Sequence, residues 1–380
     1  MTAERSRPTT PMELREAMPA FDEGRYFNFG AHGPSPRQVV AAGEQATRAH
    51  EYEVPVTDDP YKWAFGQYDE VRERLAAFLG VEADEVALTE STTAGINAIA
   101  GAIDWEPGDV VVRTDLEHPA GVLPWQRLEA EGVEVRVVET AGGRLDIETF
   151  REAVADARLV CFSALTWTHG TMLSVEELVD IAHDAGAFTL VDAVQVPGQR
   201  PMDVTAWGAD AVAAAGHKWL LGLWGGGFLY VDREAASDLA PRAVGYRSVE
   251  EPTGDEFAFA AGARRFEVGT TSVAPYAGLA EAIEIIESVG VDRIHERSQR
   301  LAGRLADAVP ADRLLSPAAP DSGLVTVDVE DPEATADRLA EDGLIVRPLP
   351  EPASIRASIH AVNTEEDIDR LTAALESEWE

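Results

Sequence analysis

The chain has 380 residues, of which 31 are Lys or Arg and 68 are Asp or Glu, so its formal net charge is −37. This length suggests two or three domains, and a hydrophobic content of 45% with 26% charged residues excludes a wholly disordered chain. The negative charge argues against nucleic acids and anionic membrane surfaces as partners, because their phosphates would be repelled.

The sequence also lacks the marks of membrane and secreted proteins. It contains no run of roughly 20 apolar residues, and residues 1–20 carry charges throughout, without the apolar core of a signal peptide. Cys161 is the only cysteine, which excludes disulfides within the chain and clusters of cysteine ligands. We therefore predict a soluble cytoplasmic protein.

The basic residues are distributed in an unusual way. Lysine occurs only as Lys62 and Lys218, and every other basic residue is an arginine. A surface rich in Asp and Glu and nearly without lysine suits a salt-rich solvent, where screening weakens self-repulsion, so we expect a halophilic source. Where lysine is so rare, a remaining lysine draws attention to its amine, whose chemistry arginine cannot perform.

Apolar, strand-like runs alternate with amphipathic, helix-like runs, which predicts an α/β fold. The predicted strands are Val86–Thr89, Val110–Arg113, Val133–Val138, Leu159–Leu165, Phe188–Asp192, Ala211–Ala215 and Gly227–Val231. The predicted helices are Tyr68–Gly80, Ala94–Ala102, Pro124–Glu131, Ile147–Ala155, Ser174–Ala185 and Ala277–Val289. Continuous apolar strands indicate a sheet that is covered by helices on both faces.

The last third of the chain predicts a smaller α+β unit. Residues 245–264 are polar and glycine-rich, which indicates a long mobile loop before it. The elements predicted after residue 289 are a helix around Glu296–Val309, a strand Gly323–Val329, a helix from Ala334, strands Leu344–Arg347 and Ser354–His360, and a final helix Thr364–Glu378.

Lys218 follows the predicted strand Ala211–Ala215, in the sequence Ala-Gly-His-Lys-Trp. Ligands of open α/β sheets collect at the carboxyl ends of strands, and a primary amine there can form a Schiff base with a carbonyl. A lysine at a strand end can also lay its apolar stem on the protein and keep its amine in water. The scarcity of lysine favours the chemical role.

Three further polar groups follow predicted strands. Asp192 ends a buried strand, where a carboxylate needs a cationic partner or caps a turn. Thr92 and Thr93 open a helix, where free N–H groups suit a phosphate or are satisfied by an ordinary N-cap. His118 lies in Glu-His-Pro-Ala, and a loop histidine can be purely structural. Together, an amine, a carboxylate, a helix N-terminus and a flat ring meet the requirements of pyridoxal 5′-phosphate.

With these motifs, and with Tyr-Phe-Asn-Phe-Gly-Ala-His-Gly-Pro at residues 26–34, the chain resembles fold-type I pyridoxal-phosphate enzymes of the class V aminotransferase group, which includes cysteine desulfurases and isopenicillin N epimerase-like proteins. The resemblance covers nearly the whole chain. It implies a large α/β domain, with a mostly parallel seven-stranded sheet between helices, and a smaller C-terminal α+β domain. We assign residues 23–261 to the large domain, and residues 1–22 and 262–380, with the linking helix 277–289, to the small one.

The resemblance also implies roles for the matching residues. Lys218 would bind the cofactor as an aldimine and move a proton between the substrate Cα and the cofactor, while Asp192 would keep the pyridine nitrogen protonated. The other implied cofactor contacts are His118 stacked on the ring, Gln195 on the ring oxygen, Thr92, Thr93 and His217 on the phosphate, and Thr270 on the phosphate of a neighbouring subunit's cofactor. The last contact implies a homodimer with shared active sites.

The substrate side is implied in the same way. Arg356 lies on the polar face of the alternating segment Ser354–His360, where an arginine can also be simply solvated. In the family this arginine binds the α-carboxylate of the substrate, so the expected substrate is an α-amino acid. Ala31, His32 and Trp167 are also assigned to the substrate side, and no metal is expected.

The chain departs from the desulfurase pattern. Residues 347–355 contain no nucleophilic cysteine, Cys161 lies in an apolar strand, and Ala215 and Trp167 stand where desulfurases have Ser and Asn. We therefore expect a class V aminotransferase rather than a persulfide-forming desulfurase. A C–S or C–Se lyase, an epimerase and a catalytically silent cofactor-binding protein remain alternatives. A nucleotide enzyme is not expected, because the glycines in residues 222–227 form no nucleotide-binding motif.

Overall fold

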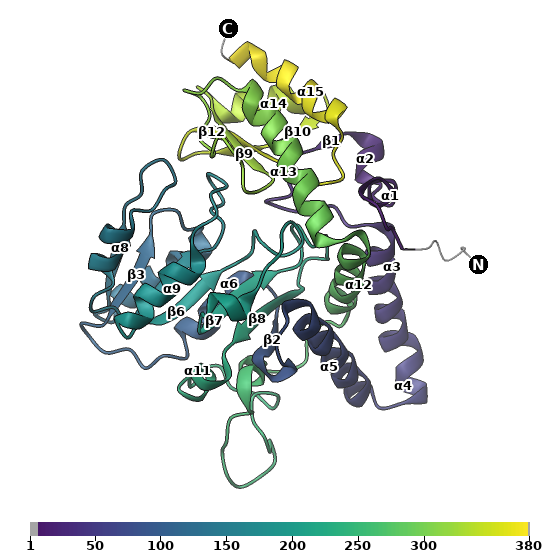
Figure 1. The fold of residues 1–380 in the computed structure, drawn as a ribbon. Helices are drawn as coiled ribbons and strands as arrows, with labels where there is room; N and C mark the ends of the chain where they lie inside the picture. Colours follow the sequence, from purple (N-terminus) through teal and green to yellow (C-terminus); the bar gives the residue numbers. More distant parts are fainter. Residues whose placement is uncertain (1–6, 379–380) are drawn as a thin grey trace.

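The computed structural model describes residues 7–378, which form a helix-covered sheet domain and a smaller domain at one end (Figure 1). The sheet order is β2-β8-β7-β6-β5-β3-β4, and all neighbours pair in parallel except β8, which is antiparallel to β2 and β7. The strands are β2 (Val86–Thr89), β3 (Val110–Thr114), β4 (Glu134–Val138), β5 (Leu159–Ser163), β6 (Phe188–Asp192), β7 (Ala211–Ala215) and β8 (Gly227–Val231). The predicted seven-stranded, mostly parallel sheet is confirmed.

Burial on both faces explains why these strands were predictable. Strands β2, β6, β7 and β8 begin and end at the predicted residues, and every residue of β5, β7 and β8 is buried. The helices of this domain are α5 (Pro60–Leu79), α6 (Thr92–Ala100), α7 (Leu123–Glu129), α8 (Ile147–Ala153), α9 (Val175–Asp184), α10 (Val204–Trp207) and α11 (Arg233–Ser237). Helix α5 begins eight residues before the predicted start because Asp59 caps it and Pro60 occupies its first position.

The N-terminal elements had no sequence-based prediction. They are α1 (Pro11–Glu16), α2 (Ala20–Glu23), β1 (Arg25–Tyr26), α3 (Arg37–Arg48), the π-helical turn η1 (Ala49–Glu53) and α4 (Val54–Thr57). Helix α3 packs along α12 (Ala274–Val289), which leads to the small domain (Figure 1). Of the segment 1–22 that we predicted to join the small domain, residues 1–6 lie outside the described part of the chain, and the domain limits stay a prediction.

The small domain has a three-stranded antiparallel sheet of order β11-β12-β9. Its elements are α13 (Val291–Ala308), β9 (Leu324–Asp328), α14 (Pro332–Glu341), β10 (Leu344–Ile345), β11 (Arg347–Leu349), β12 (Ser354–Ser358), α15 (Glu365–Leu375) and η5 (Glu376–Glu378). The predicted single strand Leu344–Arg347 is wrong. Its backbone groups find partners in two sheets, since β10 pairs with β1 and β11 pairs with β12.

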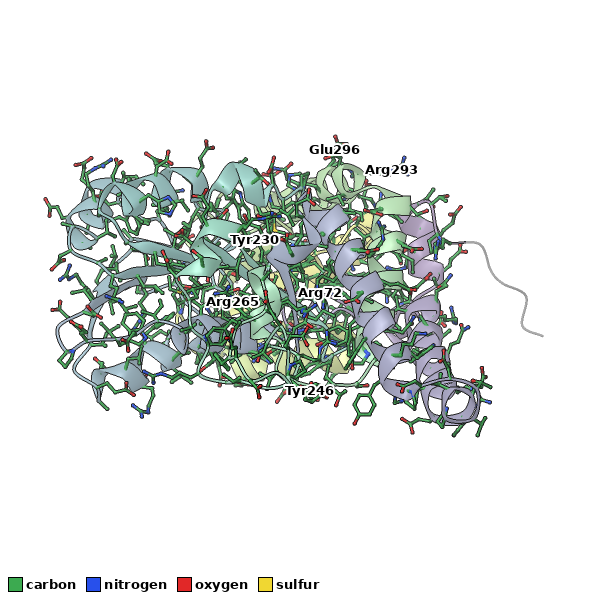
Figure 2. The ribbon with its side chains drawn as sticks, turned by 90° about the horizontal axis from the view of Figure 1, so that it is seen from below. Arg72, Tyr230, Tyr246, Arg265, Arg293 and Glu296 are labelled. Atoms are coloured by element: carbon green, nitrogen blue, oxygen red, sulfur yellow. The ribbon has the colours of Figure 1, made fainter. Side chains whose placement is uncertain are left out.

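The glycine-rich segment 245–264 extends away from the body at the bottom of Figure 1. A bridge joins Val249 to Phe259, and the 3₁₀ turn η4 (Gly262–Phe266) follows. Just beyond it, the buried carboxylate of Glu267 accepts hydrogen bonds from Arg72 of α5, at 2.8 and 2.9 Å, which anchors this end of the segment. Figure 2 labels Arg72 among the side chains of the domain. No helix within residues 7–378 combines the length and the apolar character that a lipid bilayer requires.

Candidate active site

Lys218 and Asp192 meet at the carboxyl ends of β7 and β6. Asp192 is only 3% exposed, whereas Lys218 is half-buried. Burial lowers the pKa of Lys218 to about 8, against the opposing effect of the Asp192 carboxylate. The guanidinium groups of Arg356 and Arg347 lower it further. At pH 8 about half of the amine is therefore neutral, which is the nucleophilic form.

Asp192 combines the two interpretations that its sequence position allowed. Its Oδ1 accepts a hydrogen bond from the Val194 N–H at 3.0 Å, so it does cap the turn after β6. Burial raises the pKa of Asp192, and the Val194 N–H and the Lys218 amine lower it. A buried carboxylate beside one cation can hold a second cationic N–H, such as that of a pyridinium.

His118 presents a neutral ring beside the Lys218 amine. Its Nδ1 accepts a hydrogen bond from the Ala120 N–H at 3.2 Å, and Trp167 meets its ring edge-on at 5.3 Å between centroids. Loss of hydration lowers the pKa of His118 to about 4, and the positive charge of Lys218 contributes. The ring is therefore uncharged at neutral pH and can stack on a flat heterocycle without adding a positive charge to the site.

The N-terminus of α6 and the turn after β7 could hold a phosphate. The Thr92 hydroxyl is buried and has no hydrogen-bond partner within residues 7–378, whereas Thr93 is exposed. A phosphate at this helix N-terminus would satisfy the Thr92 hydroxyl. The partly buried His217 lies 5.1 Å from the Trp224 ring, and loss of hydration lowers its pKa to about 4.

Gln195 contacts the segment 26–34 next to these residues. Gln195 is 2% exposed; its Nε2 donates to the Gly30 carbonyl at 2.9 Å and its Oε1 accepts from Trp219 at 2.8 Å. One N–H of the Gln195 amide remains for a further acceptor. Position 33 requires glycine, since a Cβ there would lie 2.0 Å from the Lys218 carbonyl oxygen.

Arg356 is a buried cation without a carboxylate partner in the described part of the chain. It is 1% exposed, its Nη1 donates to the Trp167 carbonyl at 2.7 Å, and its Nε has no partner. A Cβ at Gly30 would lie 2.9 Å from Nη2, so glycine keeps the Nε–Nη2 edge of the guanidinium open. Burial, with a contribution from Arg347, lowers the pKa of Arg356 to about 9. The solvated alternative is wrong, and the free edge suits a carboxylate.

The other predicted substrate residues lie around Gly30 and Arg356. Trp167 contacts Arg356 through its carbonyl and His118 through its ring. His32 is partly buried, which lowers its pKa, and its Nδ1 accepts from Trp224 at 2.6 Å. Ala31 donates its N–H to the Asn28 carbonyl at 3.0 Å. Contact of Ala31, His32 and Trp167 with a substrate stays a prediction.

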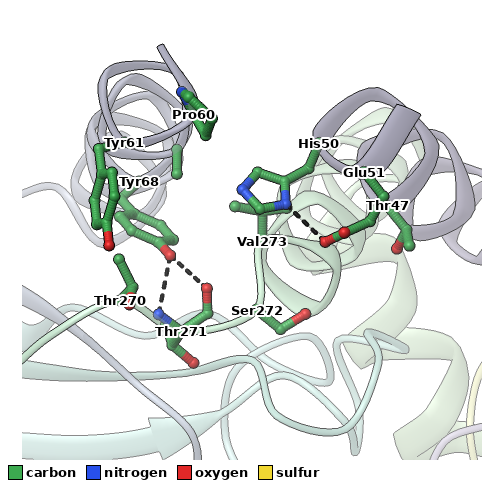
Figure 3. A pocket seen from close by; sticks show the side chains of 11 residues that line it. Thr47, His50, Glu51, Pro60, Tyr61, Tyr68, Thr270, Thr271, Ser272 and Val273 are labelled. Carbon is green, nitrogen blue, oxygen red and sulfur yellow. Dashed lines mark hydrogen bonds and ion pairs between the residues drawn. The ribbon is translucent and has the colours of Figure 1, made fainter. Parts of the chain in front are cut away.

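Thr270, which the resemblance assigns to the cofactor of a neighbouring subunit, lies apart from the other predicted site residues of its own chain. It is exposed, donates its N–H to the Tyr246 hydroxyl at 2.8 Å, and makes no hydrogen bond to the residues around Lys218. It lines a cleft of about 440 Å³ with Tyr61 and Tyr68 of α5 (Figure 3). Within one chain, Thr270 is therefore not part of the Lys218 site.

Sequence reasoning assigned no role to Glu117 or Arg347. Glu117 is 6% exposed; its Oε1 accepts from the Thr114 hydroxyl and its Oε2 from the Ser163 hydroxyl, both at 2.6 Å. Ser163 is the register partner of Asp192, so Glu117 supports the strand ends beneath the site. Its signal was a carboxylate three residues after the buried strand β3, beside His118, whereas Arg347 had no local signal.

Comparison with known proteins decides the family. The family model for class-V aminotransferases matches residues 25–371. The chain belongs to this family. A probable cysteine desulfurase of Methanothermobacter thermautotrophicus is 32% identical over 389 residues, which cover 96% of this chain and 97% of that protein.

Solved structures agree with the class-V assignment. The apo structure of a cysteine desulfurase from Thermococcus onnurineus NA1 superposes with a TM-score of 0.88 at 28% identity, covering 99% of both chains. The cystine C–S lyase C-DES, in complex with its reaction product cysteine persulfide, gives a TM-score of 0.88 at 27% identity over 94% of this chain and 98% of that one.

Class-V enzymes use pyridoxal phosphate, and the residues of this chain fit it. Lys218 offers a partly neutral amine, Asp192 a buried carboxylate for the ring nitrogen, and Thr92 a buried hydroxyl without a partner. His118 offers an uncharged ring and Gln195 a free N–H. The cofactor supplies an electron sink for a carbanion at the substrate Cα.

Glu117→Gln should flatten the pH dependence of stability. Burial raises the pKa of Glu117 from 4.5 to about 7, so folding favours its protonated form. That stability is fully present below pH 4.5 and is lost as the pH rises to about 7, which amounts to about 3 kcal/mol. Thermal unfolding of the apoprotein between pH 5 and 8, at constant salt, measures the change.

The control variant is Glu152→Gln, which removes the same charge from an exposed position. It corrects for the weaker repulsion between carboxylates that any Glu→Gln substitution causes in this acidic chain. If Glu117→Gln and Glu152→Gln show equal slopes of unfolding temperature against pH, Glu117 does not bind a proton on folding.

Proposed function

We propose that this chain is a pyridoxal-phosphate-dependent enzyme that removes the Cα proton of an α-amino acid and releases a sulfur substituent by β-elimination. The observation that carries the proposal is that the Asp192 carboxylate and the Arg356 guanidinium both lie close enough to the Lys218 amine to shift its pKa, while Arg356 has no carboxylate partner in the described part of the chain. These three groups cover cofactor attachment, ring protonation and carboxylate binding.

Different residues of the chain would carry out the separate parts of this reaction. Arg356 would hold the α-carboxylate with its free Nε–Nη2 edge, while its Nη1 stays on the Trp167 carbonyl. Lys218, with a pKa of about 8, can both accept and return a proton near neutral pH. Asp192 would keep the ring nitrogen protonated. His118 would stack on the ring, and Trp167, which meets His118 edge-on, would support it from the side.

The proposal of C–S cleavage rests on the relatives, whose names describe cysteine desulfurases and a cystine C–S lyase. A cysteine of this chain cannot carry the sulfur as a persulfide. The only cysteine, Cys161, is 0% exposed within β5, and burial raises its thiol pKa well above the usual range. The sulfur substituent would therefore leave with the electron pair of the broken C–S bond, as sulfide from cysteine or as a persulfide from cystine.

Transamination, our sequence-based expectation, is the second candidate. It needs only the groups that Lys218, Asp192 and Arg356 provide, and it requires no sulfur acceptor. Elimination and transamination begin with the same removal of the Cα proton, and the side chain of the substrate selects the outcome.

A product panel separates the candidates. Loaded protein is incubated with cysteine, cystine, S-substituted cysteines and common amino donors, each with and without an α-keto acid. Pyruvate, ammonia and sulfide indicate elimination, whereas pyridoxamine phosphate with a new oxoacid indicates transamination. A loaded protein that changes no amino acid contradicts both candidates and leaves the catalytically silent alternative.

We also propose that a second copy of the chain completes the site. Tyr61, which lines the cleft with Thr270, is 59% exposed (Figure 3). Tyr52 of η1 and Val56 of α4, which follow the lining residues His50 and Glu51 in the chain, are 68% and 83% exposed. Such a patch is typical of a protein interface. Thr270 is accessible there, and the resemblance to the family assigns it to the cofactor phosphate of the neighbouring subunit.

Tyr61→Asp should give monomers that bind the cofactor less tightly, because a charge in an apolar interface is costly to bury. Light scattering gives the mass, and cofactor titration gives Kd. The control is Tyr230→Phe, which removes only the hydroxyl group of a buried residue on strand β8. A wild-type protein that is monomeric at micromolar concentration and binds the cofactor tightly contradicts the shared site.

A further inference from the structure

The hairpin β11–β12 places two arginines directly opposite each other. In the antiparallel register, Arg347 pairs with Arg356. Side chains that are opposite each other in such a pair project from the same face of the sheet, and like charges there destabilise it. The arrangement therefore needs an explanation beyond the stability of the sheet.

Neither guanidinium is neutralised by the protein. Within residues 7–378, Arg347 has no ion pair or hydrogen bond to its side chain, and Arg356 donates only to the Trp167 carbonyl. Other exposed arginines of this acidic chain do find carboxylates, as Arg300 does with Glu365 and Arg304 with Asp369, both at 2.6 Å. Arg48, Arg144 and Arg264 also lack an ion pair and a side-chain hydrogen bond in the described part of the chain, so the lack of a partner alone does not single out Arg347. What singles it out is its position directly opposite Arg356, a second arginine without a carboxylate partner.

The two arginines also differ in depth. Arg356 is buried, and Gly30 keeps its Nε–Nη2 edge free, whereas Arg347 is exposed. The charge of Arg347 nevertheless reaches the site, because it lowers the pKa of both Lys218 and His118. One cation thus lies inside the site and one at its mouth.

We propose that Arg347 binds a second negative group, carried by the side chain of the substrate. The inference rests on the proposed function, in which Arg356 takes the α-carboxylate. The substrate class is then an α-amino acid whose side chain ends in an anion such as a carboxylate. Binding it would neutralise both cations, whereas a neutral amino acid would leave Arg347 unpaired.

Matched pairs of substrates test this assignment. S-Carboxymethylcysteine is compared with S-methylcysteine as kcat/KM of the loaded enzyme, and glutamate is compared with glutamine as a competitive inhibitor, because neither of these two carries a β-substituent that could leave. The wild type should prefer the acidic member of each pair, and Arg347→Gln should reduce that preference about tenfold to a hundredfold. The change should appear in KM for the acidic member, while KM for the neutral member stays constant.

A binding measurement separates this inference from the proposed function. Glutarate should shift the unfolding temperature of the apoprotein more than pentanoate does, and Arg347→Gln should remove the difference. Arg300→Gln, which removes the same charge at a surface ion pair, should retain it. If no amino acid is turned over but glutarate binding depends on Arg347, the reaction is wrong and the anion site stands.

Three results overturn the assignment of Arg347. The first is equal binding of both members of each pair by the wild type. The second is an equal loss of binding of acidic and neutral members in Arg347→Gln, which would mean that both arginines share the α-carboxylate. The third is the same loss of selectivity in Arg300→Gln, which would show that net charge causes the effect.

Discussion

Lys218→Ala should abolish turnover and the covalent attachment of the cofactor. Loss of a positioned proton-transfer group alone lowers the rate about 10²–10⁴-fold, and loss of the attachment point adds to this. Borohydride reduction of the loaded wild type, followed by peptide mapping, should place the cofactor on the peptide that contains Lys218. The variant should yield no such peptide.

The chain provides an unusually clean control, because its only other lysine is Lys62, which is exposed on α5. Lys62→Ala should keep full labelling and activity. The pKa of Lys218, at about 8, adds a second readout. The rate at which the apoprotein captures the cofactor should rise between pH 7 and 9, as the neutral amine increases. Labelling at Lys62, or none at all, contradicts the assignment.

Arg356→Met should weaken substrate binding without weakening the fold. Loss of a charge-assisted bond to the α-carboxylate should raise KM for amino acids about tenfold to a hundredfold. Because Arg356 is a buried cation without a carboxylate partner, an apolar side chain of similar length removes a desolvation cost. The unfolding temperature should therefore stay constant or rise. Kinetics and thermal unfolding measure the two effects.

Arg72→Met is the matched comparison, since Arg72 is also buried but is paired with Glu267 at 2.8 Å. Breaking that pair should destabilise the protein by up to about 3–5 kcal/mol. An Arg356→Met variant that is as unstable as Arg72→Met would show that Arg356 holds the fold together. An unchanged KM would remove Arg356 from the carboxylate site.

Much of the large domain could be predicted because its signals are local. Strand β6 is a continuous apolar run that ends at Asp192, and β7 ends just before the Lys218 motif. The same short segments therefore predicted both the strand ends and the polar residues that follow them. The N-terminal segment lacked such a signal. Helix α3 contributes Val39, Gly43 and Ala46 to its buried side, and this sparse apolar stripe becomes meaningful only against α12.

The amino-acid sequence by itself predicted the class of cofactor, which the comparisons confirm, and the residues that we propose to hold it, since each lies within a few residues of a strand end. Only the tertiary structure showed how the proposed substrate side is assembled. Gly30 meets Arg356 across more than 300 residues of chain, and Arg347 faces Arg356 through the register of a hairpin. Thr270 turns toward an outer cleft. Such contacts depend on how distant elements pack, which the periodicity of one segment does not encode.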